Sequence, residues 1–493
     1  MSYLADSESL RSRGWGVVLL GGGAVGAFLL LAAAQPPKWF FFLIFALAAG
    51  ALLVIIPQRE KFLLYLTVVL MTVALDFHPI YLASATTPWP VSGWRISLFE
   101  ITFILLLVLW LGRLVVEGTT PIRFFPWVSG PFLGLWLLSL LSTGRSDLPL
   151  VIKLCTLWLV MESWLIFLYF ANHLKERPRL ITVALALLLA GALQSLIGVG
   201  QYLSGSTLGL ELFGEAKTFM QMRAGEGLVS RVSGTFGHPN NLGGYLAMVL
   251  QLNLALLFAP WRRSRKVALA GLLLLLGTAL LLTLSRGAWL AFSLGALFTL
   301  FMCLSHRLKA KGVALLLAGF LVVLFMLPTS ILLEPMKRRL FQEDYGAAQA
   351  RMPLAVVALN IIRHHPWLGV GLTNYLAVAP SYDVTPEAIS YTFPQPVHNE
   401  FLLIGAELGL PALGLFLLIL GVLGRGLWRA SFQEEETPLP YVAMGLLGAF
   451  IAWGAFRLTD YHYVLLADPF WVLAGLSQGL IAVVVRETAV STT

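Results

Sequence analysis

The sequence predicts an all-α membrane protein, a polytopic helical bundle of about fourteen transmembrane helices with one large extracytoplasmic loop. Three observations predict this class. Hydrophobic residues make up 58% of the chain and charged residues only 12%, with a mean hydropathy of +0.83, which is more apolar surface than a soluble core can bury. Apolar runs of membrane length recur along the chain, and Lys and Arg collect in alternate connections between them. We therefore expect a single integral membrane domain over residues 1–493.

Each predicted helix is an apolar run close to the roughly twenty residues that cross a bilayer. The first run, 15–34, is too long for the core of a signal peptide, so we expect it to be retained as a helix. Cys155 and Cys303 lie inside apolar runs and are expected to pack as small side chains rather than to form a disulfide. The predicted spans are 15–34, 39–56, 62–76, 97–112, 130–143, 149–171, 180–203, 242–259, 267–284, 287–304, 313–327, 399–424, 440–457 and 468–485.

The short connections predict the orientation of these helices, because Lys and Arg accumulate on the cytoplasmic side of a membrane protein. The strongest basic cluster is 261–266, and the basic connections 59–61, 175–179 and 307–311 fall on the same side if every run spans. This pattern predicts that both termini are cytoplasmic. If the chain changes sides at each predicted span, four polar segments lie on the outer face: 204–241, the corner 285–287, the loop 328–397 and 457–467.

The net charge of +8 is explained by these orientation signals and by contact with anionic membrane lipids. No basic stretch is interleaved with aromatic residues, so nucleic acid is not an expected partner. The sequence shows no soluble domain and no internal repeat, and Glu434–Glu436 is expected to be a solvated cytoplasmic loop.

The outer loop 328–397 is the most unusual segment, because roughly seventy polar residues without an apolar run interrupt a chain of membrane helices. We expect it to be structureless and to act as a lid or binding element. Cations are normally sparse on the outer face, so those in this loop indicate an anionic ligand. They are Lys337, Arg338, Arg339, Arg351 and Arg363.

Three outer residues carry the candidate chemistry. Arg286 lies in a turn of almost no length between two spans, where an arginine either snorkels to the membrane surface or binds an anion. Arg351 and His398 lie in segments that can fold over the same corner, and two guanidinium groups would suit a diphosphate. His398 begins a membrane helix, so it is either a polar cap or a proton-transfer group. We expect no metal site and no cofactor, because the outer loops show no paired carboxylates and no cluster of His and Cys.

An ordered set of motifs resembles the bacterial O-antigen ligase and O-antigen polymerase superfamily. The resemblance covers about residues 220–425, and each motif alone is weak whereas the ordered set is specific. The motifs are Arg231–Asn241, Ser285–Gly287, Arg351, His364–Tyr375, His398–Phe401 and Glu407–Gly409.

This resemblance implies a glycosyltransferase of the bacterial inner (plasma) membrane that acts in lipopolysaccharide biosynthesis. Its donor would be a glycan linked to polyprenyl (undecaprenyl) diphosphate, its acceptor a hydroxyl of a glycolipid or glycan, and its chemistry metal-independent and inverting. By position, Arg286 and Arg351 match the two arginines that hold the diphosphate, and His398 matches the histidine that activates the acceptor. The motifs leave two activities open, a ligase and a polymerase that joins lipid-linked repeat units. Supporting roles are assigned to Arg231, His238, Asn240, Asn399 and Glu400.

Several alternatives stay open at this stage. His238 and Asn240 either begin a helix, with Pro239 in its first turn, or contact substrate. Glu162, within a predicted span, is either functional or a neutral, hydrogen-bonded group. Many helices and an intramembrane carboxylate are also typical of a transporter, although the sequence lacks the repeats expected of one. An oligosaccharyltransferase is disfavoured because its acidic motifs are missing, and Asp460–Tyr461–His462 does not replace them.

Overall fold

The computed structural model describes most of the chain, and several predicted features lie outside the described residues. The features outside are the spans 15–34 and 313–327, most of 39–56, the cations Lys337, Arg338 and Arg339, and Glu434–Glu436. The described residues are 44, 45, 47, 48, 50, 58–82, 90–117, 122–224, 227–305, 312, 349–433, 437–466 and 469–491.

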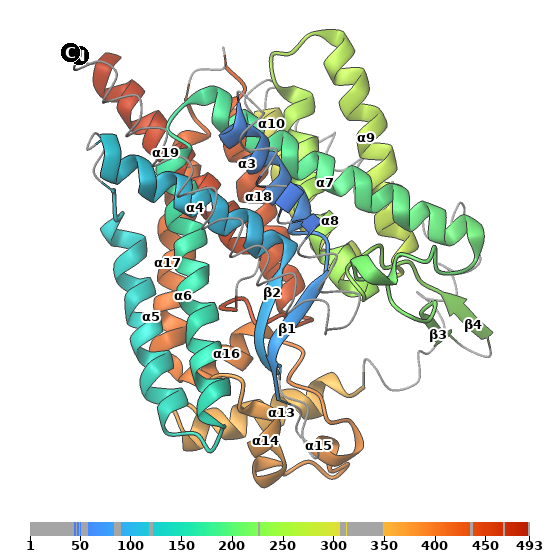
Figure 1. Ribbon diagram of the computed structural model, residues 1–493. Coiled ribbons are helices and arrows are strands. Elements are labelled where there is room, and N and C mark those ends of the chain that lie inside the picture. The colour runs from blue at the N-terminus through green and yellow to red at the C-terminus, as the bar shows by residue number, and fades with distance from the viewer. Residues whose placement is uncertain are drawn as a thin grey trace, which may run out of the picture.

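Helices dominate the described chain (Figure 1). Two antiparallel two-stranded sheets, β1–β2 and β3–β4, are the exceptions to the all-α prediction. The elements in order are α3 (Arg59–Leu70), β1 (Asp76–Tyr81), β2 (Gly93–Ser97), α4 (Leu98–Glu117), α5 (Pro126–Gly144), α6 (Leu150–His173), α7 (Arg177–Ser204), η1 (Glu211–Phe213), β3 (Gln221–Ala224), β4 (Gly227–Ser230), α8 (Pro239–Phe258), α9 (Arg263–Leu282), α10 (Arg286–Ser305), α13 (Arg351–His364), α14 (Tyr375–Val378), η2 (Ala379–Tyr382), α15 (Ile389–Thr392), α16 (Glu400–Leu408), α17 (Leu410–Ala430), α18 (Leu439–Arg457) and α19 (Phe470–Ser491).

Eight of the described helices are long and apolar enough to cross a membrane, namely α5 to α10, α17 and α18, and Phe470–Arg486 is a shorter apolar helix. The protein is therefore a multi-pass membrane protein, although the predicted count of about fourteen spans is not confirmed. At the predicted span 62–76 the helix is shorter than predicted. Helix α3 has only 12 residues, and the chain then enters β1. Twelve helical residues reach about 18 Å, which is less than the roughly 30 Å hydrocarbon core.

The predicted span 399–424 is wrong as a single helix. The helix is interrupted at Gly409, which separates α16 from α17. The φ of Gly409 is 86°, a value that is unfavourable for residues with a side chain. A Cβ at Gly409 would lie 2.4 Å from the carbonyl carbon of Trp367, and Leu410 N donates to Pro366 O at 2.8 Å. The close approach of residues 366–368 to this break therefore excludes a side chain there.

The prediction that 328–397 is structureless is also wrong for its described part. Residues 349–397 form α13, α14, η2 and α15, and they pack in a small apolar core that also includes Leu403 and Ala406 of α16. That core contains Leu354, Val357, Tyr375 and Val397, each at most 1% exposed. The chain therefore forms a packed cap whose shape fixes the residues that it carries, rather than a loose loop.

Helix α8 is the central helix of the bundle. In its apolar window 83% of the residues are buried, compared with 28% for α9. It packs against both α18 and α10. Glycines allow this close packing, because a Cβ at Gly445 of α18 would lie 2.9 Å from the Cα of Leu252. The N-terminus of α8 is consequently held in a fixed position against the end of α18, where the candidate site lies.

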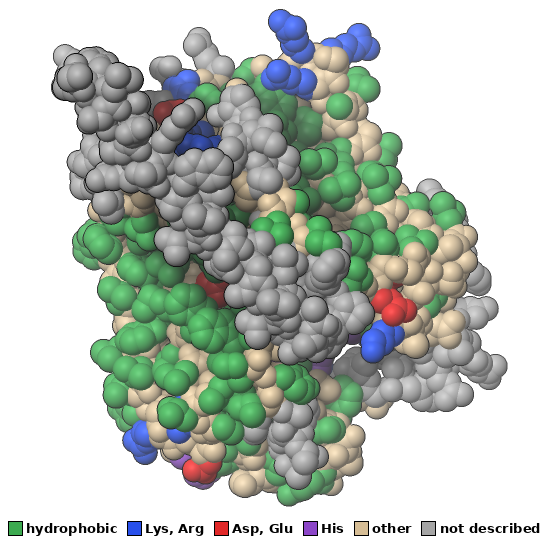
Figure 2. Space-filling model, in the orientation of Figure 1, with side chains coloured by type: hydrophobic (Ala, Val, Ile, Leu, Met, Phe, Trp, Pro, Cys, Tyr) green, Lys and Arg blue, Asp and Glu red, His purple; other side chains and the backbone are tan. Residues whose placement is uncertain are grey.

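The basic turn between α8 and α9 and the cap helices α13 to α15 lie at opposite ends of the protein (Figure 1). Figure 2 shows Lys and Arg side chains gathered at the upper end, over this turn, and hydrophobic side chains along the flanks. This separation agrees with the charge pattern, which assigns Arg262–Lys266 to the cytoplasm and the cap to the outside.

We expect cysteine labelling to reproduce this orientation. Glu387→Cys in the cap and Ser264→Cys in the basic turn are both at exposed positions, whereas Cys155 and Cys303 are buried. An impermeant maleimide added to whole cells with a permeable outer membrane should label Glu387→Cys directly and Ser264→Cys only after lysis. Labelling of Glu387→Cys from the inside alone would reverse the orientation on which the site proposal depends.

Candidate functional site

His398 and Asp460 form a hydrogen-bonded pair at the end of the bundle that the charge pattern places outside. His398 lies two residues before α16, and Asp460 lies three residues after α18. His398 Nδ1 and Asp460 Oδ1 are 3.3 Å apart, and the two side chains are 22% and 11% exposed. The carboxylate of Glu400, which is only 1% exposed, accepts from His462 N at 2.6 Å and Val464 N at 2.7 Å. Glu400 thus ties the loop that carries Asp460 to the helix that follows His398.

A chain of hydrogen bonds continues from Asp460 to Arg231. Asn240 Nδ2 donates to Asp460 Oδ2 at 2.8 Å, and Arg231 Nη2 donates to Asn240 Oδ1 at 2.7 Å. Arg231 Nε also donates to the carbonyl of Thr283 at 2.8 Å. Both oxygens of Asp460 are therefore held, and the position of His398 depends on residues from four separate parts of the chain.

The carboxylate of Asp460 sets the tautomer and the orientation of the His398 imidazole. Burial raises the pKa of Asp460, but the hydrogen bond and charge of His398, with Arg457 nearby, outweigh it and leave the pKa below its usual value. An ionised carboxylate only accepts hydrogen bonds, so the Nδ1 of His398 must carry the proton. The Nε2 of neutral His398 then has the lone pair that can take a proton.

His238 and Asn399 act as helix caps, and Asn240 does not. His238 Nδ1 accepts from Asn240 N at 3.1 Å at the start of α8, with Pro239 in the first turn. Burial and the charges of Arg231 and His398 lower the pKa of His238 to about 4, so it is neutral at pH 7 and can accept this bond. Asn399 Oδ1 accepts from Leu402 N at 3.0 Å at the start of α16. These two residues set helix directions, whereas Asn240 belongs to the Asp460 network.

Arg286 begins α10, three residues after Thr283, whose carbonyl accepts a hydrogen bond from Arg231. The turn from α9 is only three residues long, as predicted, and Leu284 adopts a φ of 51°, which costs about 1–2 kcal/mol for a residue with a side chain. A Cβ at Gly287 would lie 2.6 Å from Thr459 Oγ1, next to Asp460. The strained turn therefore places Arg286, which is partly buried, next to Gly287, and Gly287 packs against the loop that carries Asp460.

Arg351 begins α13, and the packing of its helix links it to the same region. Ala350 and Leu354 share the cap core with Val397, and Tyr461 and Tyr463 pack against that core. Within the described part of the chain, the Nε of Arg351 is buried and has no hydrogen-bond partner. A buried donor without a partner is costly, so it marks a place where an acceptor can bind.

A cavity of about 680 Å³ opens beside the histidine. Its lining includes His398, Asp460, His238 and Asn240, together with Phe393 and Tyr461, whose rings lie 6.3 and 5.4 Å from the imidazole. A second cavity of about 440 Å³ adjoins it and shares Pro90, Asn241, His462 and Tyr463 with it. Both volumes lie in the range of small-molecule sites.

Part of the chain matches a known protein family. Residues 271–417 match the model of the family described as O-antigen ligase. This segment belongs to that family. The O-antigen ligase segment contains Arg286, Arg351 and His398, so the resemblance predicted from the motifs is confirmed. It ends before Asp460 and begins after Arg231, which the fold brings to His398.

No curated protein shows significant similarity to the chain. One solved structure that resembles it comes from work titled "Structural coordination of polymerization and crosslinking by a peptidoglycan synthase complex". The similar chain is 17% identical, the match covers 73% of this protein and 97% of that chain, and the TM-score is 0.40.

Sequence reasoning missed Asp460 as the partner of His398. Asn399 and Glu400 were the expected neighbours, but one caps α16 and the other fixes the loop 460–464. Asp460 does lie in a polar segment that the charge pattern places outside, which is the signal that could have found it. Glu162 lies within α6, 4% exposed, and its Oε2 has no hydrogen-bond partner among the described residues. Also within the described part, no three side chains of His, Cys, Asp or Glu gather closely enough to hold a metal ion.

Proposed function

We propose that this protein is a glycosyltransferase that moves a glycan from a polyprenyl (undecaprenyl) diphosphate donor to an acceptor hydroxyl at the outer face of the inner membrane. The observation that carries the proposal is the His398–Asp460 pair, which lines a cavity. His398 belongs to the segment that matches the O-antigen ligase family, and that segment also contains Arg286 and Arg351. Both arginines stand at helix N-termini, where the helix dipole also favours an anion.

In this reaction His398 acts as the general base. Its Nε2 takes the proton of the acceptor hydroxyl as the oxygen attacks the anomeric carbon of the donor sugar. The bond from that carbon to the diphosphate breaks, and the electron pair leaves with the diphosphate. Asp460 stabilises the imidazolium that forms, as a carboxylate does in hydrolase triads. Arg286 and Arg351 stabilise the charge that develops on the diphosphate. Attack opposite the leaving group inverts the anomeric configuration.

The O-antigen ligase type is the activity that we favour, with a glycolipid as acceptor, because the matching family bears that description. A polymerase that joins two lipid-linked repeat units is the alternative. The purified protein should be given a lipid-linked glycan donor with and without a lipid A-core acceptor. Transfer only with the acceptor supports a ligase, and a product ladder without it supports a polymerase. No transfer in either mixture, by protein of intact fold, contradicts the proposal.

Asp460→Asn is expected to lower turnover by about 10²-fold or more, because the amide keeps the size of the side chain but removes the charge that orients and stabilises the imidazole. Loss of the anion makes imidazolium less stable, so His398 should remain a base at lower pH. The acid limb of the pH–rate profile should therefore move to lower pH. Glu387→Gln, which removes an exposed carboxylate from the cap, is the matched control. An unshifted acid limb in Asp460→Asn would leave Asp460 with a structural role only.

We also expect the transfer to proceed in excess EDTA, because the chemistry assigned to His398 and the two arginines requires no Lewis acid. The rate with chelator should match the untreated rate within error. A loss of turnover that Mg²⁺ or Mn²⁺ restores would show that the assigned side chains are insufficient.

A further inference from the structure

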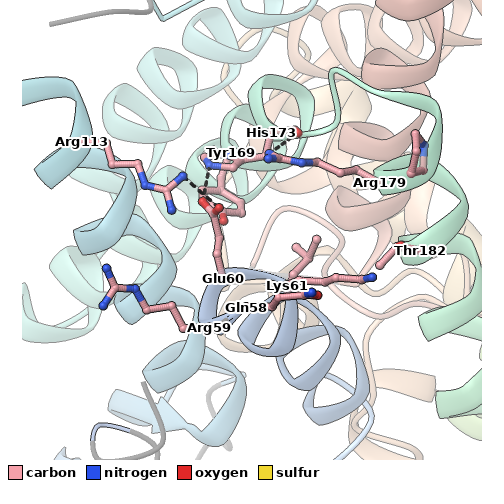
Figure 3. Close-up of a pocket in the computed structure, with 11 residues that line it drawn as sticks. Gln58, Arg59, Glu60, Lys61, Arg113, Tyr169, His173, Arg179 and Thr182 are labelled. Atoms are coloured by element: carbon pink, nitrogen blue, oxygen red, sulfur yellow. Dashed lines mark hydrogen bonds and ion pairs between the residues drawn. The ribbon is translucent and has the colours of Figure 1, made fainter. Parts of the chain in front are cut away.

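A separate cavity of about 420 Å³ lies at the end of the bundle that the charge pattern places in the cytoplasm, among residues of α3, α4, α6 and α7 (Figure 3). Its lining is strongly basic and includes Arg59, Lys61, Arg113 and Arg179. Among the described residues, none lines both this cavity and the one beside His398.

Among the described residues that line this cavity, Glu60 is the only carboxylate, and it faces two basic side chains. Glu60 Oε2 accepts from Arg113 Nη1 at 2.9 Å, and Glu60 Oε1 lies 3.2 Å from His173 Nε2, as Figure 3 shows. The close contact with His173 and the positive charge of Arg113 outweigh burial and lower the pKa of Glu60 to about 2. Glu60 is therefore ionised at neutral pH and offsets about one positive charge. Arg179 also lies 3.8 Å from the carboxylate of Glu176, so Arg59 and Lys61 remain as the excess positive charge of the lining.

Orientation signals alone do not account for this arrangement. Tyr169 is one of the lining residues, its hydroxyl is buried, and none of the described residues hydrogen-bonds to that hydroxyl. The ring is locked in place, since it stacks on His173 at 4.1 Å and meets Trp110 edge-on at 5.7 Å. A buried hydroxyl without a partner costs about 1–3 kcal/mol. A ligand with acceptor oxygens would remove that cost, whereas snorkelling cations would not.

We propose that this cavity binds a phosphate group, supplied by an anionic phospholipid headgroup or by free phosphate. Phosphate oxygens can accept hydrogen bonds from guanidinium groups and from a tyrosine hydroxyl. The negative charge of a phosphate group would also balance the excess positive charge of the lining. Basic pockets between transmembrane helices on the cytoplasmic side bind such headgroups. The site is at the opposite end from the transfer chemistry, so its test does not depend on the proposed function.

The test compares Arg59→Gln/Lys61→Gln with a control that removes two cations from another basic turn, Arg262→Gln/Arg263→Gln. Purified full-length protein in detergent is titrated with phosphatidylglycerol, phosphatidylcholine or inorganic phosphate, and binding is followed by native mass spectrometry and by thermal stability. The first variant should bind its anion roughly twenty- to thirtyfold more weakly, because each cation near a membrane surface contributes about a factor of five. The control should bind like the native protein.

The ligands separate the two sources. Preference for phosphatidylglycerol over phosphatidylcholine, without an effect of phosphate, indicates a lipid headgroup. Stabilisation by phosphate, without lipid preference, indicates the free ion. Tyr169→Phe keeps the ring and removes the unpartnered hydroxyl, so it should weaken binding several-fold even if the double variant folds poorly. Equal binding by the native protein, Arg59→Gln/Lys61→Gln and Tyr169→Phe would overturn the proposal, as would a response to none of the ligands.

Discussion

His398→Ala is expected to reduce glycan transfer by a factor on the order of 10² to 10⁴, which is what a positioned general base contributes. Donor binding should change little, because it is assigned to Arg286 and Arg351. The fold should survive, since Glu400 and Asn399 hold the start of α16 through their own hydrogen bonds. Single-turnover kinetics and a separate measurement of donor affinity distinguish the two effects.

His364→Ala is a suitable control for this change. His364 lies in the same cap, at the end of α13, and is exposed, with Nδ1 2.8 Å from the carbonyl of Asn360. Its loss should leave transfer near the native rate. The role of His398 as base is refuted by native turnover in His398→Ala, or by a product that retains the anomeric configuration of the donor.

The order of motifs predicted the region of the site because each motif is local. Arg286 sits in a turn between two apolar runs, and His398 begins one, so both positions can be read from the neighbouring residues alone. The pairing of His398 with Asp460 cannot be read in this way. It depends on the return of the loop 458–466 to α16, which Glu400 fixes through bonds to residues 62 and 64 positions later. No periodicity in the sequence encodes such a contact.

The errors in the predicted fold have the same origin. Apolar length predicts a helix but not its interruption, and the break at Gly409 is enforced by Trp367, which lies in the cap. The cap was expected to be structureless because its polar sequence lacks a long apolar run. Its core is instead assembled from short pieces that contain Leu354, Tyr375 and Val397, which become apolar surfaces only when they meet.

Arg286→Lys and Arg351→Lys are each expected to be nearly as damaging as the corresponding alanine variants, with transfer reduced by at least about tenfold. Lysine keeps the charge but loses the planar fork that binds two phosphate oxygens at once. A lost hydrogen bond to a charged group costs about 1.5–3 kcal/mol, which is roughly 10- to 10²-fold. The loss should appear as weaker donor binding and slower departure of the diphosphate, and the pH–rate profile should keep its native shape.

Arg363→Lys is the matched control, because Arg363 lies on the same helix as Arg351 but is exposed in its last turn. If positive charge on the outer face only steers the anionic donor, then all three lysine variants should transfer glycan like the native protein, and salt should slow them equally. If the diphosphate is gripped by the forks, only Arg286→Lys and Arg351→Lys should fail. Native activity in both of these variants would exclude bidentate binding of the diphosphate. The buried Nε of Arg351 would then not be explained by a bound diphosphate.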